Sequence, residues 1–131
     1  MANRIISVPG SSKYFRGGIV AYSNDIKILF LDISDKMLKK HTAVSKEVCL
    51  QMAKSIQKNM NVNVSVATSG YAGSSNINKS LGLVYIACCV NDKSFVKKIN
   101  LEGTRKEIIN KTSNKAIGFT IKKIQKVFRN K

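Results

Sequence analysis

Several polar residues lie where an α/β protein usually binds small molecules. Tyr22 and Lys27 follow one apolar run, Ser69 and Gly70 follow a second, and Arg105 lies at the predicted start of a helix. Ligands of open α/β sheets bind where the strands end. A lysine at such a position can bind a phosphate or, when it is partly removed from water, act as a general base. From the residue types alone, a solvated lysine and a half-buried strand tyrosine remain the alternatives.

The position of Arg105 also indicates an anion. The helix macrodipole disfavours a cation in the first turn, so an arginine there favours an anionic partner, with an ordinary surface arginine as the alternative. The sequence has neither a P-loop nor a G-x-G-x-x-G fingerprint, so neither motif supports nucleotide binding. Cys49, Cys88 and Cys89 show no C-x-x-C spacing, and His41 is the single histidine. We therefore predict reduced core thiols, an isolated loop or capping histidine, and no metal site.

Length and composition predict one domain that spans residues 1–131. The chain is 44% hydrophobic and 23% charged, which is enough apolar mass for a packed core. No apolar run approaches the ~18 residues that a membrane-spanning helix needs. Arg4 and Pro9-Gly10 leave no room for the apolar part of a secretory signal. We therefore expect a cytoplasmic protein without membrane contact.

The net charge of +16 makes nucleic acid a candidate partner. The sequence has 23 Lys and Arg against 7 Asp and Glu, and such an excess gives affinity for polyanions at low salt. The excess is nearly all lysine, in a chain that is also rich in Asn and Ile. A biased codon supply would produce the same composition, so weak nucleic-acid binding and a functionally neutral charge both remain open.

Hydrophobic periodicity and capping residues predict helices mixed with strands, and hence a layered α/β domain. The predicted elements are a strand over 18–23, a helix over 46–59 capped by Ser45, a strand from Asn61, an interior strand over 83–90, a peripheral strand over 95–101 and a helix begun by a capping box at Thr104–Glu107. Residues 24–30 fit either a short helix capped by Ser23 or a longer first strand. The small, polar stretch between Ser69 and Gly82 is the candidate functional loop.

Separate stretches, in order along the whole chain, resemble the CinA C-terminal domain, a family that includes nicotinamide-nucleotide amidohydrolases and competence/damage-inducible proteins. The matching motifs are Val-Pro-Gly-Ser-Ser-x-Tyr-Phe-x-Gly-Gly over 8–18, Val-Ala-Tyr-Ser-Asn-x-x-Lys over 20–27, His-x-Ala-Val-Ser over 41–45, Gly-x-Ala-Gly over 70–73 and Gly-x-Val-Tyr-Ile-Ala over 82–87. The resemblance implies three α/β/α layers around a mixed, mostly parallel sheet.

The resemblance also implies an activity, the hydrolysis of nicotinamide mononucleotide to nicotinate mononucleotide and ammonia in pyridine nucleotide recycling. It implies a small-molecule nucleotide substrate, no metal or redox cofactor, and a homo-oligomer. In this family a serine nucleophile is thought to work with a lysine that has a tyrosine beside it. Lys27 matches this lysine and Tyr22 matches the tyrosine. Residues matched to substrate binding are Ser69, Gly70, Gly73 and Arg105, the last in Gly103-Thr104-Arg105 where the family has Gly-Asp-Arg.

One family motif has no counterpart in the sequence. The Glu-Ser-Cys-Thr-Gly-Gly segment, which carries the expected nucleophile at the end of an interior strand, would precede Ala2, where the sequence has Met1. Without that strand we expect unpaired backbone groups in the middle of the sheet. Either the true start lies upstream, or the sheet is completed differently, for example by a partner chain. Three alternatives remain. Another serine could replace the nucleophile, and the candidates are Ser11, Ser12, Ser23 and Ser69. The chain could also be a catalytically silent module that binds polyanions, or a structural subunit of an oligomer.

Overall fold

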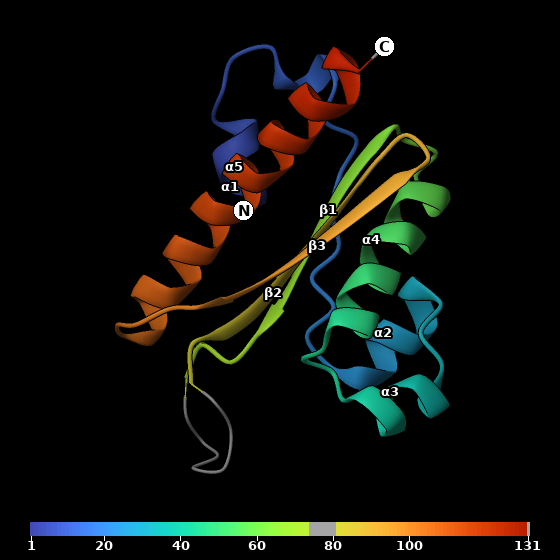
Figure 1. The fold of residues 1–131 in the computed structure, drawn as a ribbon, viewed down its shortest axis with the longest axis vertical. Helices are drawn as coiled ribbons and strands as arrows, with labels where there is room; N and C mark the ends of the chain where they lie inside the picture. Colours follow the sequence, from blue (N-terminus) through green and yellow to red (C-terminus); the bar gives the residue numbers. More distant parts are fainter. Residues whose placement is uncertain (74–80, 131) are drawn as a thin grey trace.

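Helices lie on both faces of a sheet in the computed structural model, which describes residues 1–73 and 81–130 (Figure 1). In chain order the elements are α1 (Ala2–Ile6), the 3-10 turn η1 (Ser11–Lys13), α2 (Asn24–Leu31), α3 (Asp35–His41), α4 (Lys46–Asn59), β1 (Val64–Gly70), β2 (Leu83–Val90), β3 (Lys93–Asn100) and α5 (Arg105–Arg129). Within these ranges no helix is long and apolar enough to cross a membrane. The predicted α/β class is confirmed.

The sheet has the order β1-β2-β3, and both pairs of neighbours are antiparallel. The prediction of a mostly parallel sheet is therefore wrong for the part of the chain that the structure describes. The physical reason lies in the connections. Asn91 and Asp92 alone join β2 to β3, with Asn91 at a φ of 54°. A parallel pair would need a crossover of about a dozen residues or more.

The central strand β2 is covered on both faces, as its continuous apolar sequence predicts. Ala87 and Cys89 of β2 face α4 and pack with Val48 and Ala53 of that helix. Val84 and Ile86 face the other way, toward α5, which runs alongside the strands with α1 beside it (Figure 1). Two apolar clusters therefore form, one on each side of the sheet. Burial also raises the pKa of the Cys49 thiol to about 12.

Capping residues predict the helix starts correctly. Ser45 accepts a hydrogen bond from the Val48 backbone N–H at the start of α4, and Thr104 forms the predicted capping box with Glu107 at the start of α5. Residues 24–31 form helix α2, which decides between the two alternatives left by the sequence.

The strand predicted over 18–23 is not present. The segment leading from η1 to α2 has no ladder partner among the described residues, and Val20 is 87% exposed while Tyr22 is 82% exposed. Its β-branched residues favour extended backbone, but a strand also needs a neighbour to exchange hydrogen bonds with. The predicted start of β1 at Asn61 is three residues early, because Asn61 has a φ of 50°.

Two glycines give a matched test of this backbone. Gly82 has a φ of 84°, and a Cβ there would lie 1.8 Å from the Leu101 carbonyl oxygen, whereas a Cβ on Gly118 in α5 would meet nothing within 4 Å. We expect Gly82→Ala to lower the free energy of unfolding by more than about 2 kcal/mol. Gly118→Ala should raise it by about 0.5–1 kcal/mol, because alanine favours a helix interior.

Urea denaturation followed by circular dichroism measures both changes. Equal effects of the two substitutions would contradict the close approach of the backbone at Gly82.

Candidate functional site

Three strand ends meet at one edge of the sheet, which we call the site edge. It comprises the end of β1, the start of β2 and the end of β3, because the strands are antiparallel. Backbone bonds hold it together: Tyr71 N donates to Leu83 O at 3.0 Å, and Leu101 N donates to Gly82 O at 2.8 Å. Helix α5 starts four residues after Leu101. The topology thus brings the predicted glycine-rich region and Arg105 to one place.

Arg105 contacts two of the other predicted site residues. Its Nη2 donates to the Tyr22 hydroxyl oxygen at 3.4 Å. A Cβ added to Gly73 would lie 2.9 Å from the Arg105 Nη1, so the guanidinium lies directly against the backbone of this glycine. The side chains of Tyr22 and Arg105 are exposed. Three residues from distant parts of the sequence therefore form an exposed, cationic corner of the site edge.

Ser69 and Gly70 lie at the end of β1, close to this corner in sequence and fold. A Cβ on Gly70 would lie 2.7 Å from Val84 Cγ2, so only glycine fits this backbone. The Ser69 hydroxyl donates to the Ala43 carbonyl at 2.7 Å. The hydroxyl hydrogen of Ser69 therefore points to a carbonyl in the turn between α3 and α4, while the hydroxyl oxygen can still accept a hydrogen bond.

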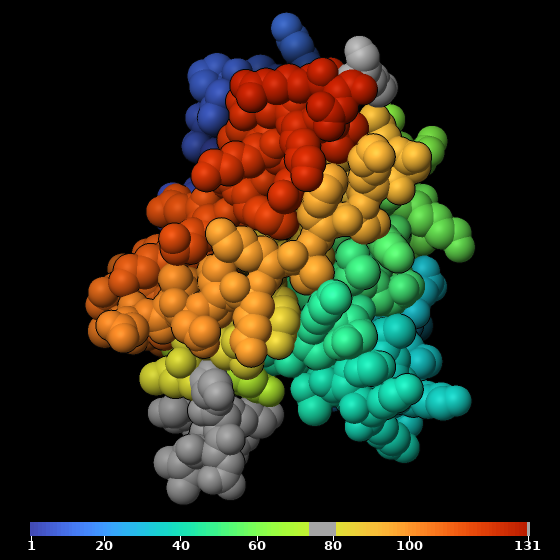
Figure 2. Space-filling view, viewed as in Figure 1, coloured from blue at the N-terminus to red at the C-terminus, as the bar shows by residue number. Residues whose placement is uncertain are grey.

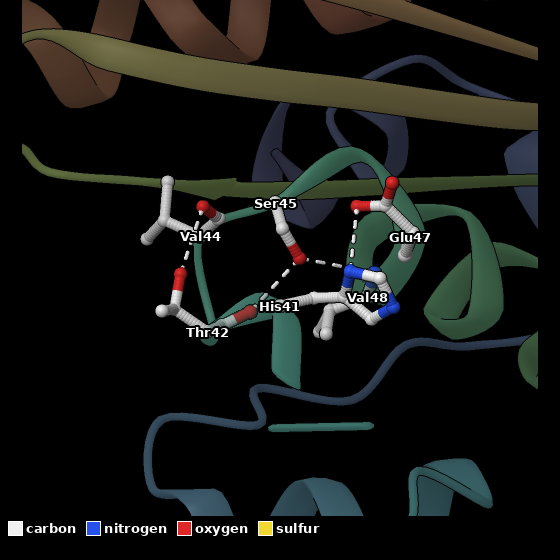
Figure 3. Close-up of polar contacts among 6 residues, drawn as sticks. All are labelled: His41, Thr42, Val44, Ser45, Glu47 and Val48. Atoms are coloured by element: carbon white, nitrogen blue, oxygen red, sulfur yellow. Dashed lines mark hydrogen bonds and ion pairs between the residues drawn. The ribbon is translucent and has the colours of Figure 1, made fainter. Parts of the chain in front are cut away.

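The turn that holds Ser69 is stabilised by its own hydrogen bonds (Figure 3). Ser45 Oγ donates to Thr42 O at 2.8 Å and accepts from Val48 N at 3.3 Å. Thr42 has a φ of 67°. His41 Nδ1 lies 3.6 Å from Glu47 Oε2 across the same turn. The prediction of an isolated His41 is therefore wrong, because Glu47, six residues further along the chain, lies beside its ring across the loop.

Lys27 is buried. It lies in the second turn of α2, only 7% of its surface is exposed, and burial lowers the pKa of its ammonium group. The alternative of a solvated lysine is therefore wrong. Across residues 1–73 and 81–130, no hydrogen bond or ion pair joins its side chain to Tyr22, Ser69 or Arg105. Lys27 is thus a buried basic group, five residues after Tyr22 in the chain, without a polar contact to the exposed corner in the part of the chain that the structure describes.

The remaining candidates are distributed along the molecule. Ser23 is the N-cap of α2. The turn η1, which contains Ser11 and Ser12, lies toward the C-terminal end of α5, at the opposite end of the long axis from the site edge (Figure 1). Residues 74–80 of the predicted functional loop lie outside the described residues. The site edge therefore gathers Tyr22, Ser69, Gly70, Gly73 and Arg105 and excludes the two serines of η1.

Comparison with known proteins gives consistent matches. A family model described as the CinA C-terminal domain matches residues 1–124. A competence-damage inducible protein of Clostridium botulinum is 42% identical over 121 residues, which is 91% of this chain and 30% of that protein. One from Alkaliphilus oremlandii is 38% identical over 110 residues, 82% of this chain and 27% of that protein. The chain thus spans about a third of these curated relatives.

Solved structures share the fold. A competence or damage-inducible protein of Enterobacter asburiae superposes with a TM-score of 0.89 at 21% identity, covering 94% of this chain and 79% of that one. A competence/damage inducible protein of Agrobacterium tumefaciens gives 0.86 at 29% identity, covering 92% and 75%. The layered arrangement that positions the site edge is therefore common to these proteins.

The burial of Lys27 predicts a pH-dependent gain in stability for Lys27→Met. The folded pKa lies below that of the unfolded chain, so between these two values the unfolded chain binds more protons and stability rises with pH. At pH values below this window the buried charge destabilises the fold by about 1.4 kcal/mol for each tenfold change in the acid dissociation constant. Lys27→Met removes this penalty, so its advantage should shrink as pH approaches about 10.4.

Urea denaturation from neutral to alkaline pH measures this difference, with the exposed Lys54→Met in α4 as the control. An advantage of Lys27→Met that stays constant over the whole range would show that the lysine is not desolvated.

Proposed function

Because the chain belongs to the CinA C-terminal domain family, we propose that it binds nicotinamide mononucleotide at the site edge and takes part in the hydrolysis of its carboxamide. The products would be nicotinate mononucleotide and ammonia. The observation that carries the proposal is the burial of Lys27 in α2, which lowers the pKa of its ammonium group. A lysine can accept a proton only when it is neutral, and burial favours the neutral form.

The cationic corner suits the phosphate of such a substrate. Arg105 is exposed and carries five N–H donors, of which the structure places one on Tyr22. Gly73 has no side chain over the guanidinium, so an anion can approach both the arginine and the loop backbone. Ser69 Oγ, whose proton is donated to Ala43, could accept a hydrogen bond from a substrate amide N–H.

The proposed reaction needs a nucleophile besides these groups. A serine hydroxyl would transfer its proton to Lys27 as its oxygen attacks the amide carbon. Lys27 would then pass this proton to the amide nitrogen as the C–N bond breaks, so that ammonia leaves. Water would hydrolyse the acyl-serine to the carboxylate and return a proton to the serine oxygen. The Ser69 proton already has an acceptor, and η1 lies at the other end of the molecule. The family resemblance implies a nucleophile in a Glu-Ser-Cys-Thr-Gly-Gly segment, which this sequence does not contain, so we assign the nucleophile to that segment and the base to Lys27.

A chimera tests this assignment. Residues that precede the matched region of the Clostridium botulinum relative are joined to Ala2, and ammonia release from nicotinamide mononucleotide is measured by a coupled assay. We expect turnover by the chimera and a loss of at least about 100-fold in the Lys27→Ala chimera, because the general base is removed. In the same assay the present chain should give only background.

The control is Lys54→Ala in the chimera, an exposed lysine of α4 whose loss should leave turnover unchanged. A folded chimera that releases no ammonia would rule out the amidase. Calorimetric titration of the present chain separates binding from chemistry: Arg105→Ala should weaken binding of the mononucleotide by about tenfold or more, since a charge-assisted bond to phosphate is lost.

A further inference from the structure

A groove between α5 and β3 is bordered by lysines, and we call it the lysine groove. Lys97 of β3 and Lys115 and Lys122 of α5 line a pocket of about 170 Å³. The surfaces of α5 and β3 are adjacent on the face seen in Figure 2. The groove lies on the side of the sheet opposite α4, and its lining residues include none of the five candidate residues gathered at the site edge. It is therefore a separate feature from the proposed amidase site.

The floor of the groove is apolar. Ile99 and Phe119 form its surface above the fully buried Ile86, and Gly118 leaves the space open because it has no side chain. The strand register places Lys97 beside these apolar residues. Lys97 pairs with Ile86, so both side chains point to the α5 face of the sheet. Charged groups thus stand at the rim, and a ring-sized apolar space lies between them.

The lysines at the rim have no acidic partners. Residues 93–130 include eleven Lys and Arg but only Glu102 and Glu107 as acids, and Glu107 is hydrogen-bonded in the capping box. No ion pair within the described ranges involves Lys97, Lys115 or Lys122. Like charges gathered on one face repel one another, so a bound polyanion would stabilise them.

The charged surface extends beyond the pocket along α5. Lys123 Nζ lies 4.9 Å from the ring centroid of Phe95 and 5.2 Å from that of Phe119, and Lys126 Nζ lies 5.9 Å from Phe95. These cation-aromatic contacts hold two further ammonium groups beside the groove. A lysine-rich composition alone would scatter charge over the surface, whereas here lysines and aromatic rings line one path.

We propose that the lysine groove binds single-stranded nucleic acid, with phosphates on the rim lysines and one unpaired base on the apolar floor. Cationic grooves with apolar or aromatic surfaces bind single strands with little sequence preference. The pocket volume is close to the ~150 Å³ of a cavity that holds one benzene ring, so the space matches the size of a single aromatic base. A base within a duplex would first have to leave its stack.

Fluorescence anisotropy of a labelled, mixed-sequence single-stranded oligonucleotide tests this proposal. Three phosphate contacts predict a slope of roughly −2 for the logarithm of the association constant against that of the salt concentration. The double variant Lys97→Glu/Lys122→Glu should bind at least about tenfold more weakly at low salt. The matched control, Lys36→Glu/Lys54→Glu, makes the same change in net charge on exposed lysines of α3 and α4 and should retain most of the affinity.

Gly118→Leu tests the base separately from the phosphates. Its side chain enters open space and fills the pocket without removing charge. It should weaken binding of the oligonucleotide while binding of inorganic polyphosphate is unchanged. Thermal unfolding of each variant confirms that it is folded, and Gly118→Ala serves as a second variant with a smaller side chain.

Three outcomes would overturn the proposal. Equal losses in the groove and control double variants would show that only net charge matters. Duplex DNA or polyphosphate that binds as tightly as the single strand would exclude the base from the pocket. An acidic polypeptide that displaces the oligonucleotide at equal charge concentration would assign the groove to protein instead. None of these outcomes bears on the ammonia assay, so the two proposals fail independently.

Discussion

Strand β2 has to be covered on both faces and paired on both edges, because its eight residues are apolar nearly throughout. Helix α4 covers one face and α5 the other, while β1 and β3 supply the ladders. The two proposed binding regions follow from this arrangement. The site edge forms where the ends of the strands meet, and the lysine groove forms where α5 leaves part of β3 uncovered.

Close backbone approach makes the site edge compact. Gly70 lies against Val84, Gly82 lies against the carbonyl of Leu101, and Gly73 lies against Arg105. A side chain at Gly70 or Gly82 would push apart the backbone segments that meet there, whereas one at Gly73 would displace the flexible side chain of Arg105. The sequence predicted a functional loop here, with a backbone suited to close approach of a ligand. In the described residues the close contacts are with the neighbouring strand ends and an arginine of α5.

Local signals explain which features could be predicted from sequence. The caps Ser45 and Thr104 and the apolar run of β2 act within a few residues, so pattern alone identified two helices and the interior strand. Strand direction depends on connections, and the assumption taken from the family resemblance was wrong for the described strands. The prediction of a strand over 18–23 was wrong because β-propensity alone does not supply a neighbouring strand to pair with. The burial of Lys27 and the pairing of His41 with Glu47 depend on tertiary packing.

Burial determines the behaviour of Lys27, whereas surface charge determines anion binding at the site edge and at the lysine groove. Lys27 owes its lowered pKa to desolvation, which is local and is hardly changed by dissolved salt. Arg105 and the groove lysines are exposed, so their attraction for anions adds to the field of a chain of net charge +16 and is screened within about 10 Å at 0.1 M salt. Ionic strength should therefore weaken anion binding at both regions together, while the proton affinity of Lys27 stays nearly constant. A change in salt concentration thus distinguishes the binding of the anion, which it weakens, from proton transfer to Lys27, which it should hardly affect.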